Sequence, residues 1–408
     1  MIRILNHSEA KALTTRKAVR LEEAERIVAP ILSAIRSRGD AALLEYARKF
    51  DGFEGHSVRM PVAGTLTPEL ERAVALAAEN IREYARTQLP QEGSVEYPDG
   101  RKLGHIVRPL DSMGAYIPAG RYPLPSTLLM TVIPAQVAGV PLTCAACPNP
   151  SPEILGVAAW LGITHLFRMG GAQAIAAFAY GTETVPKVAR IVGPGNIYVA
   201  AAKKLIAGEA GIDFVAGPTE IVIIAAEGDP RWLAADLLAQ AEHDVDASAI
   251  LLTTSRTLAE AVAAEVERQL VTLPTAAVAR PSIDANGAIV VVDSLQRAVE
   301  FSNELAPEHL SLHDASLIPN IQNAGSIFLG PWSPEAAGDY ASGPNHVLPT
   351  SGAARLRGGL SAADFVKIIS VQELTPAGLA KLTPAITALA RAEGLEAHAR
   401  SAEVRCGG

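Results

Sequence analysis

The fold is indicated first by residues 189–204, which read ARIVGPGNIYVAAAKK. An apolar run over 189–192 ends at the turn GPGN at 193–196, and an alanine- and lysine-rich segment follows. This order is typical of a strand, a tight turn and a helix. Backbone amides at such a helix start can bind an anionic group such as a pyrophosphate. The dinucleotide fingerprint would need a third glycine where this chain has Tyr198, so an ordinary tight turn is the alternative.

Similar apolar runs recur through the centre of the chain, with alanine-rich segments between several of them. Apolar strands that alternate with helices indicate parallel sheets covered on both faces. The predicted strands are 140–147, 165–169, 189–192, 221–226, 249–253 and 288–292. We therefore predict an α/β protein.

The residues before this centre show helical periodicity. Over 22–50, apolar residues recur mostly at the spacing of one helix face, with a predicted break at Gly39-Asp40. The pattern returns over 67–88, where Thr67-Pro68 is predicted to be the cap and the first helical residue. After Ser361 the chain is predicted to be helical again.

Length and composition restrict the class of protein. A chain of 408 residues argues for two or three domains, and 49% hydrophobic with 19% charged residues excludes global disorder. The 35 basic and 43 acidic residues give a net charge of −8, which argues against binding to nucleic acid or to an anionic membrane. Three cysteines cannot form a disulfide framework, and we expect a reducing, cytoplasmic location.

Neither the charge-free stretch of the chain nor its first residues fit a membrane or targeting signal. Residues 122–152 carry no charge, but their prolines and Gln136 leave no run of about 20 helix-compatible apolar residues. We predict a buried loop, helix and strand there, and no membrane association. The first residues, 1–7, turn polar too soon for a secretory signal.

Cys144 and Cys147 have the spacing of a redox or zinc motif. A second such pair is absent from the sequence, and this one ends an apolar strand before Pro148. Buried packing is therefore the favoured interpretation. Cys406 is expected to be a solvent-exposed thiol.

Histidines in polar surroundings are the strongest chemical signal. Gln240 and His243 are three residues apart on a predicted helix, so they project to one face as two metal ligands must. A carboxylate such as Asp339 and another imidazole would complete a zinc site of nitrogen and oxygen donors, with room for substrate. Taken singly, each histidine is more commonly a surface or hydrogen-bonded residue.

Glu308 and His309 are a second chemical signal. An adjacent acid and imidazole on a segment that we predict to be irregular can act as two independent proton-transfer groups. An imidazole titrates in the range required of a general base near neutral pH. A helix N-terminus with a capping glutamate is the alternative.

As an ordered set, these motifs resemble the histidinol dehydrogenase family along nearly the whole chain. The resemblance rests on residues 114–120, 170–174, 192–198, 212–218, 236–244, 306–310, 328–350 and 393–398. It implies NAD⁺-linked, zinc-dependent oxidation of L-histidinol through L-histidinal to L-histidine, the last two steps of histidine biosynthesis. Two NAD⁺ are reduced, and each subunit holds one zinc ion.

The resemblance also implies a role for individual residues. His309 is the general base and Glu308 activates water. Zinc is held by Gln240, His243 and Asp339 of one subunit and by His398 of its partner. The implied NAD contacts are Tyr116, Gln173 and Asn196, and the implied substrate contacts are Thr219, Gln240, His243, His309, Asp339, Glu393 and His398.

For the architecture, the resemblance implies an intertwined homodimer. Each chain has two incomplete Rossmann-like domains with parallel-rich sheets, and small helical N- and C-terminal domains are exchanged between subunits. The predicted parts are an N-terminal arm at 1–12, a first Rossmann-like domain with the zinc and catalytic motifs at 13–112 and 219–360, a second with the NAD contacts at 113–218, and a small C-terminal domain at 361–408 that contributes to the partner's site.

One position departs from the family pattern. Thr219 stands where the family usually has serine in the motif AGPSE, and this adds a methyl group near the expected substrate. The alternative function is therefore a paralogous zinc and NAD dehydrogenase of another polar alcohol or diol. A third reading, a non-catalytic metal- or nucleotide-binding protein, is disfavoured because such a protein has no need for both Glu308 and His309.

Overall fold

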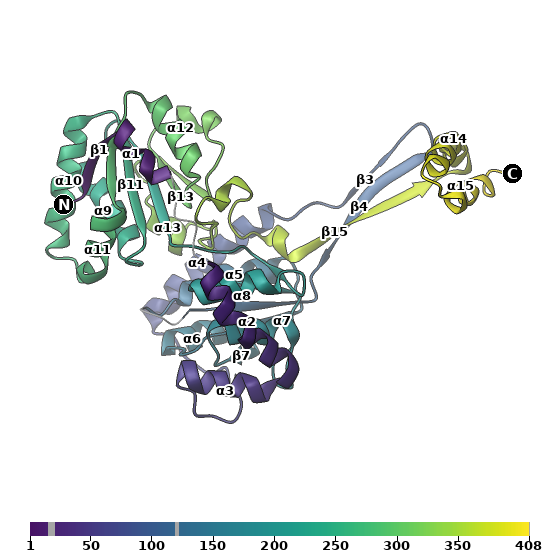
Figure 1. The fold of residues 1–408 in the computed structure, drawn as a ribbon, viewed down its shortest axis with the longest axis horizontal. Coiled ribbons are helices and arrows are strands. Elements are labelled where there is room, and N and C mark those ends of the chain that lie inside the picture. Colours follow the sequence, from purple (N-terminus) through teal and green to yellow (C-terminus); the bar gives the residue numbers. More distant parts are fainter. Residues whose placement is uncertain (15–20, 119–121, 408) are drawn as a thin grey trace. The chain divides into compact units, whose positions relative to one another are not determined.

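The computed structural model describes residues 1–14, 21–118 and 122–407. The chain divides into two compact units (Figure 1). The larger contains Met1–Gln88 and Asp111–Phe365, and the smaller contains Leu89–Leu110 and Val366–Gly408. The motif at 114–120 is described as far as Pro118, and its last two residues lie outside the described part.

The first sheet of the larger unit is parallel throughout its described strands. Their order is β1-β12-β11-β10-β13-β14. The strands are β1 (Arg3–Asn6), β10 (Glu220–Ile224), β11 (Ser248–Thr253), β12 (Ala288–Val291), β13 (His309–Leu312) and β14 (Ser326–Leu329).

Helices cover both faces of this first sheet (Figure 1). In β10, Ile221 and Ile223 pack into the core with α9, α10 and α11, whereas Val222 and Ile224 face the core that includes α1 and α12. This alternation follows from the two-residue period of a strand. The helices are α1 (His7–Thr14), α9 (Pro230–Ala241), α10 (Arg256–Leu270), α11 (Ala276–Asn286) and α12 (Leu295–Leu305).

The second sheet of the larger unit has the strand order β2-β7-β6-β5-β8-β9 and is parallel except for the β2–β7 pair. Its strands are β2 (Arg59–Met60), β5 (Ser112–Tyr116), β6 (Leu142–Ala146), β7 (His165–Phe167), β8 (Arg190–Val192) and β9 (Gly211–Ile212). The helices of this region are α2 (Leu21–Arg38), α3 (Asp40–Asp51), α4 (Pro68–Thr87), α5 (Pro125–Val137), α6 (Pro152–Trp160), α7 (Gly171–Tyr180) and α8 (Ile197–Ile206).

The predicted elements of the centre are confirmed. Each predicted strand is found within about two residues of its expected limits, in β6, β7, β8, β10, β11 and β12. The helical region before it breaks at Gly39, which has a φ of 54° between α2 and α3. Thr67 caps α4, because its side chain accepts a hydrogen bond from the amide of Leu70.

The structure divides the chain differently from the predicted domain limits. Residues 1–12, expected as an arm beside a small helical domain, supply β1 and most of α1 to the first sheet. Helices α2 and α3, expected with residues 219–360, share a core with the second sheet instead. Their apolar faces include Ile31, Ile35 and Leu43, which are buried in that core.

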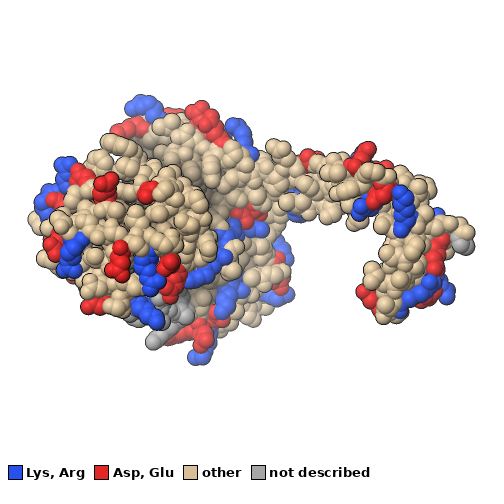
Figure 2. All heavy atoms as spheres, turned by 90° about the horizontal axis from the view of Figure 1, so that it is seen from above, with Lys and Arg blue, Asp and Glu red and all other residues tan. Residues whose placement is uncertain are grey.

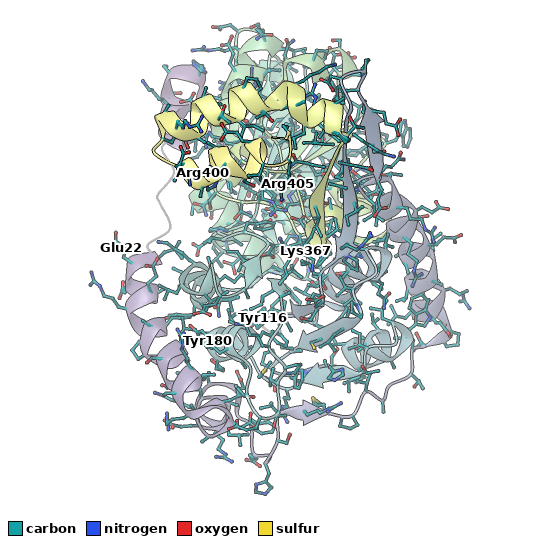
Figure 3. All side chains as sticks on the ribbon, turned by 90° about the vertical axis from the view of Figure 1, so that its right-hand side faces the viewer. Glu22, Tyr116, Tyr180, Lys367, Arg400 and Arg405 are labelled. Atoms are coloured by element: carbon teal, nitrogen blue, oxygen red, sulfur yellow. The ribbon has the colours of Figure 1, made fainter. Side chains whose placement is uncertain are left out.

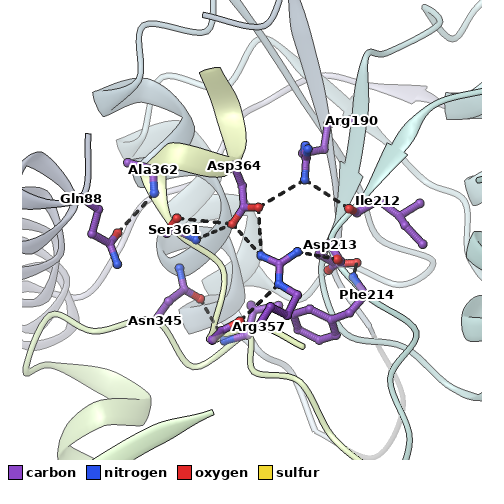
Figure 4. A network of polar contacts seen from close by, with 12 residues as sticks. Gln88, Arg190, Ile212, Asp213, Phe214, Asn345, Arg357, Ser361, Ala362 and Asp364 are labelled. Carbon is purple, nitrogen blue, oxygen red and sulfur yellow. Dashed lines mark hydrogen bonds and ion pairs between the residues drawn. The ribbon is translucent and has the colours of Figure 1, made fainter. Parts of the chain in front are cut away.

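A polar network joins the segment that follows α13 (Glu335–Tyr340) to the second sheet (Figure 4). The Asp364 carboxylate accepts hydrogen bonds from Arg357 at 2.7 and 2.9 Å and lies 3.4 Å from Arg190. Arg357 also donates to the carbonyl of Asp213, and Arg190 donates to the carbonyl of Ile212. These contacts fix residues 357–364 against β8 and β9.

The smaller unit contains the antiparallel sheet β15-β4-β3 and two helices. They are β3 (Gly93–Glu96), β4 (Arg101–Pro109), β15 (Val366–Leu374), α14 (Pro376–Ala392) and α15 (Glu396–Glu403). The prediction of a helical tail is wrong for β15, whose nine residues all pair with β4. It is right for α14 and α15.

The charge-free stretch 122–152 folds as expected, into helix α5 and strand β6. Among the described residues, no helix is long and apolar enough to span a membrane. Basic and acidic side chains are interspersed on the surface of the larger unit (Figure 2).

The cysteines differ sharply in exposure, as predicted. Cys144 and Cys147 are fully buried, and burial raises the pKa of each thiol to about 12. Because the thiolate is the reactive form, we expect a disulfide reagent at pH 8 to modify one thiol per folded chain, the exposed Cys406. All three should react in denaturant. A count of two or three fast thiols in the folded protein would contradict the buried positions.

Candidate functional site

The predicted proton-transfer residues and Thr219 lie at the amino ends of two neighbouring strands of the first sheet. His309 is the first residue of β13, directly after Glu308, and it lies opposite Ile221 of β10. Thr219 directly precedes β10. The predicted irregular segment at His309 is therefore a strand, and parallel pairing brings the two chain segments together.

Three of the predicted metal ligands come from α9, the turn that follows it, and α13, and the two helices contact each other. Gln240 lies in the last turn of α9, and His243 lies in the turn that follows, one residue beyond the cap Glu242. The expectation that both lie on the helix thus holds for Gln240 alone. Asp339 lies on α13.

Distances between side chains define one cluster. His243 Nε2 lies 3.9 Å from Asp339 Oδ2, and His309 Nε2 lies 3.7 Å from Asp339 Oδ1. His309 Nδ1 lies 3.7 Å from Glu308 Oε2 and 3.6 Å from Glu335 Oε1. The fold therefore brings together four of the predicted residues and adds Glu335.

Glu335 is a member of the cluster that the sequence reasoning missed. It is 2% exposed, and ligand atoms of His243, Glu335 and Asp339 all lie within 4.8 Å of one another. Its four-residue spacing from Asp339 is the signal that could have found it, because such residues share a helix face.

Gln240 is fully buried, and its neighbours fix the orientation of its amide. With the amide nitrogen toward Glu335, it donates to Oε1 at 2.5 Å and Oε2 at 3.1 Å, and its oxygen lies 2.7 Å from Thr219 Oγ1. An ionised carboxylate can only accept, so the charged form of Glu335 favours this orientation. Thr219 Oγ1 also lies 2.5 Å from Glu308 Oε2, which accepts the Glu220 amide at 2.9 Å.

Burial and mutual charge shift the titration of the proton-transfer pair. Burial raises the pKa of Glu308 to about 7, although His309 and Thr219 oppose the shift. Burial also disfavours the charged form of His309, but Glu335, Glu308 and Asp339 outweigh it and raise its pKa to about 10. Burial likewise raises the pKa of Glu335 well above its usual range.

The donor set fits a zinc ion. The His243 side chain is 43% exposed, yet desolvation by the protein around it lowers its pKa, which favours the neutral imidazole. Burial opposes the charge on Asp339, yet the histidines around it keep its pKa below the usual value. A neutral imidazole and an ionised carboxylate are the forms that bind a metal, and nitrogen and oxygen donors suit zinc.

His309 has one ring nitrogen without a hydrogen-bond partner among the described residues. Its buried Nε2 is 3.7 Å from Asp339, too far for a hydrogen bond. Its Nδ1 lies 3.2 Å from the carbonyl oxygen of Glu220. Since a carbonyl only accepts, Nδ1 carries a proton, and the ring presents a lone pair at Nε2 whenever it is neutral.

The predicted NAD contacts lie together at the second sheet. Tyr116, Gln173 and Asn196 line one cavity of about 470 Å³. Tyr116 ends β5, and the other two follow β7 and β8, so the cavity lies at the carboxyl ends of the strands. Figure 3 shows Tyr116 in the interior of the larger unit. Ligands of parallel α/β sheets commonly bind at this edge.

The turn at 193–196 uses its amides differently from the prediction. Asn196 Oδ1 accepts hydrogen bonds from the amides of Tyr198 and Val199, both at 3.1 Å. Two of the amides that the sequence offers to an anion are thus capped within the protein. The hydroxyl, amide and apolar groups around the cavity fit the neutral parts of a dinucleotide.

Glu393 and His398 belong to the smaller unit. Glu393 caps the C-terminus of α14, and His398 lies on α15. Both side chains are exposed. Their expected roles remain predictions.

An acid and imidazole pair beside donors that could hold a metal ion, with a cavity at the second sheet of an α/β fold, is typical of an enzyme. Comparison with known proteins identifies the family. The family model described as histidinol dehydrogenase matches residues 14–406. The histidinol dehydrogenase of Geobacillus kaustophilus is 48% identical, with 94% of each chain covered, and that of Rhizobium meliloti is 46% identical over 97% of this chain and 95% of its own. The crystal structure of histidinol dehydrogenase from Elizabethkingia anophelis superposes with a TM-score of 0.94 at 38% identity, covering 99% of this chain and 98% of that one.

The chain belongs to the histidinol dehydrogenase family. It is therefore an oxidoreductase of amino-acid biosynthesis.

Proposed function

We propose that this protein oxidises L-histidinol through L-histidinal to L-histidine with two NAD⁺, using one zinc ion per subunit. The observation that carries the proposal is the cluster of His243, Asp339, Glu308 and His309. Neighbouring side-chain nitrogen and oxygen atoms in it lie at most 3.9 Å apart, and the chain belongs to this family. An acid, a base and metal donors in one place are what an alcohol and aldehyde oxidation needs.

Gln240, His243 and Asp339 would hold zinc in one subunit, together with the partner subunit's His398. A bound zinc ion supplies orientation, because it can hold an amino alcohol through its nitrogens. Support comes from the neutral form that desolvation favours at His243 and from the ionised form that the neighbouring histidines favour at Asp339. Thr219, Gln240, His309, Glu393 and His398 are proposed to contact the substrate.

In the first oxidation His309 removes the hydroxyl proton at Nε2 while a hydride passes from the same carbon to NAD⁺. The contact of Nδ1 with the Glu220 carbonyl holds the ring in the required tautomer. Three carboxylates raise the pKa of His309 in the isolated chain. Zinc held by His243 and Asp339 would offset one of these charges and would lower this pKa toward that of a working base.

In the second oxidation the aldehyde must first add water, since only the hydrate carries a hydride to donate. Glu308 is proposed to take the proton from that water, and a second NAD⁺ accepts the hydride. Its pKa of about 7 suits a group that takes and returns a proton near neutral pH. Glu308 is 6% exposed, so its carboxylate is largely separated from bulk water.

A homodimer in the cytoplasm is part of this proposal. The sheet of the smaller unit exposes large apolar side chains, with Val95 and Ile368 at 58% and 59% and Ile369 and Val371 at 44% and 43%. Val95 and Ile368 lie on one face of this sheet and Ile369 and Val371 on the other. Exposed apolar groups of this kind favour contact with another protein surface. A second copy that covers this sheet would also supply the partner subunit's His398.

The stoichiometry of the reaction tests the function. We expect the purified protein to form two NADH per L-histidinol, to lose activity on chelation and to regain it with zinc. One NADH with accumulation of free aldehyde would contradict the four-electron reaction. No NADH from histidinol, in a protein that still binds zinc and NAD⁺, would favour the alternative of another polar alcohol or diol.

A further inference from the structure

The cavity at the second sheet contains one charged side chain among its described lining residues, Asp51. Asp51 is the last residue of α3, where a negative charge meets the unfavourable end of the helix dipole. A half-buried carboxylate in this position needs a compensating interaction. The start of α7 provides it.

Asp51 Oδ2 accepts two hydrogen bonds, from the amide of Gly170 at 2.9 Å and from Gln173 Nε2 at 3.1 Å. Burial raises the pKa of Asp51, and these hydrogen bonds, with the charge of Arg168, oppose that shift. Oδ1 has no hydrogen-bond partner among the described residues. The carboxylate therefore keeps one oxygen available as an acceptor at the cavity.

The cavity is suited to the adenosine half of a dinucleotide. Its described lining shares no residue with the cluster around His309, where the nicotinamide must react. The other half of the molecule is thus the one that this cavity receives. Ile27, Phe50 and Tyr198 line it and are 49%, 51% and 43% exposed, so they offer free apolar surface to a base.

Arg168 is the basic residue whose charge acts on Asp51, and its guanidinium makes its hydrogen bonds with other groups. Arg168 Nε donates to the carbonyl of Pro148, and its Nη2 donates to Asn149 Oδ1. Its guanidinium lies over the Phe53 ring, 5.6 Å from the centroid. No lysine or arginine appears among the described residues that line the cavity.

We propose that Asp51 accepts a hydrogen bond from the 2′-hydroxyl of the adenosine ribose and thereby selects NAD⁺ over its 2′-phosphorylated form. The inference rests on the proposed function, because it takes the cavity as the dinucleotide site. A carboxylate stabilises a hydroxyl donor, whereas it repels a phosphate dianion at the same position. Asp51 is in this view a specificity-determining residue.

Binding titrations of the full-length protein test this role without turnover. NADH and NADPH are each titrated into the wild-type protein and into the Asp51→Asn variant. Binding is measured from the fluorescence of the nucleotide. We expect wild type to bind NADH at least about tenfold more tightly, and the variant to lose about tenfold in NADH affinity while NADPH affinity holds or rises. An asparagine with its oxygen in the place of Oδ2 keeps both hydrogen bonds, from the Gly170 amide and from Gln173 Nε2.

Asp40→Asn is the matched control. Asp40 lies on the same helix and accepts a hydrogen bond from the Thr184 hydroxyl, but it does not line the cavity. We expect its ratio of NADH to NADPH affinity to equal that of wild type. A folded Asp51→Asn protein with the wild-type ratio would overturn the role of Asp51.

A second measurement uses wild type alone and so does not depend on the folding of a variant. We expect an NAD⁺ analogue that lacks the 2′-hydroxyl of the adenosine ribose to bind about tenfold more weakly than NAD⁺. Equal binding of the two would overturn the inference. A wild-type protein that binds neither NADH nor NADPH would instead contradict the proposed function itself, which separates the two failures.

Discussion

Replacement of His309 by asparagine is expected to lower kcat by about 10²- to 10⁴-fold, the usual contribution of a general base. His309 Nε2 is buried and has no hydrogen-bond partner among the described residues, so the lost group is the one placed to take the substrate proton. Asparagine keeps a polar group in the cluster but has no basic lone pair. Steady-state NADH formation from L-histidinol measures the effect.

The zinc content of the same variant serves as an internal check, because we expect it to match wild type. His313→Asn is the control for folding of the strand. His313 follows the other end of β13, next to the Gly228 turn. We expect it to keep kcat within about threefold of wild type. A His309 variant with unchanged kcat would show that the base lies elsewhere.

Replacement of Lys203 by methionine is expected to lower the free energy of unfolding by about 3–5 kcal/mol. The Lys203 and Asp213 side chains are 3% and 0% exposed, and Nζ lies 2.6 Å from Oδ1. Methionine fills the space of the lysine stem but leaves Asp213 as a buried charge without its partner. Urea unfolding, followed by circular dichroism, measures the loss.

This ion pair also holds the backbone of Gly193. Lys203 Nζ donates to the Gly193 carbonyl at 2.5 Å, and Asp213 Oδ2 accepts the Gly193 amide at 2.8 Å. Gly193 has a φ of 114°, and a Cβ there would collide with the carbonyl oxygen of Tyr116. The pair therefore fixes the turn that leads to Asn196, and its loss should loosen the cavity as well.

Lys204→Met is the control, one residue further along the same helix. Lys204 is half exposed and pairs with Glu25 at the surface. Such a pair contributes at most about 1 kcal/mol. Equal unfolding midpoints for the two lysine variants would contradict a buried, stabilising pair at Lys203.

The sequence predicts the central strands well because their signal is local. Each is a short apolar run bounded by turns, and burial on both faces of a parallel sheet requires that composition. Strand β15 has no such signal. Its side chains are largely exposed on both faces, and its partner β4 lies far away in the chain, so the pairing cannot be inferred from a local window.

In the candidate site, too, the sequence predicts contacts between residues close together in the chain but not contacts between distant segments. The spacing of Gln240 and His243 is local, and it predicts two neighbouring donors. The approach of Asp339 to His309 depends on how α13 packs against α9, which no local pattern reveals. Glu335 was missed because a glutamate on a short helix resembles a solvated residue until the packing buries it.

The pairing of β4 with β15 also sets the order in which the protein is completed during synthesis. Translation proceeds at roughly 5–20 residues per second, so the stretch of about 260 residues between the two strands takes on the order of 13–50 s to emerge. During this interval β4 has β3 as its only neighbour among the described strands of its sheet. A two-stranded hairpin is marginal in water, and its open edge is a template for association with other nascent chains. The smaller unit is thus the last part of the protein to fold and the part most dependent on a completed chain.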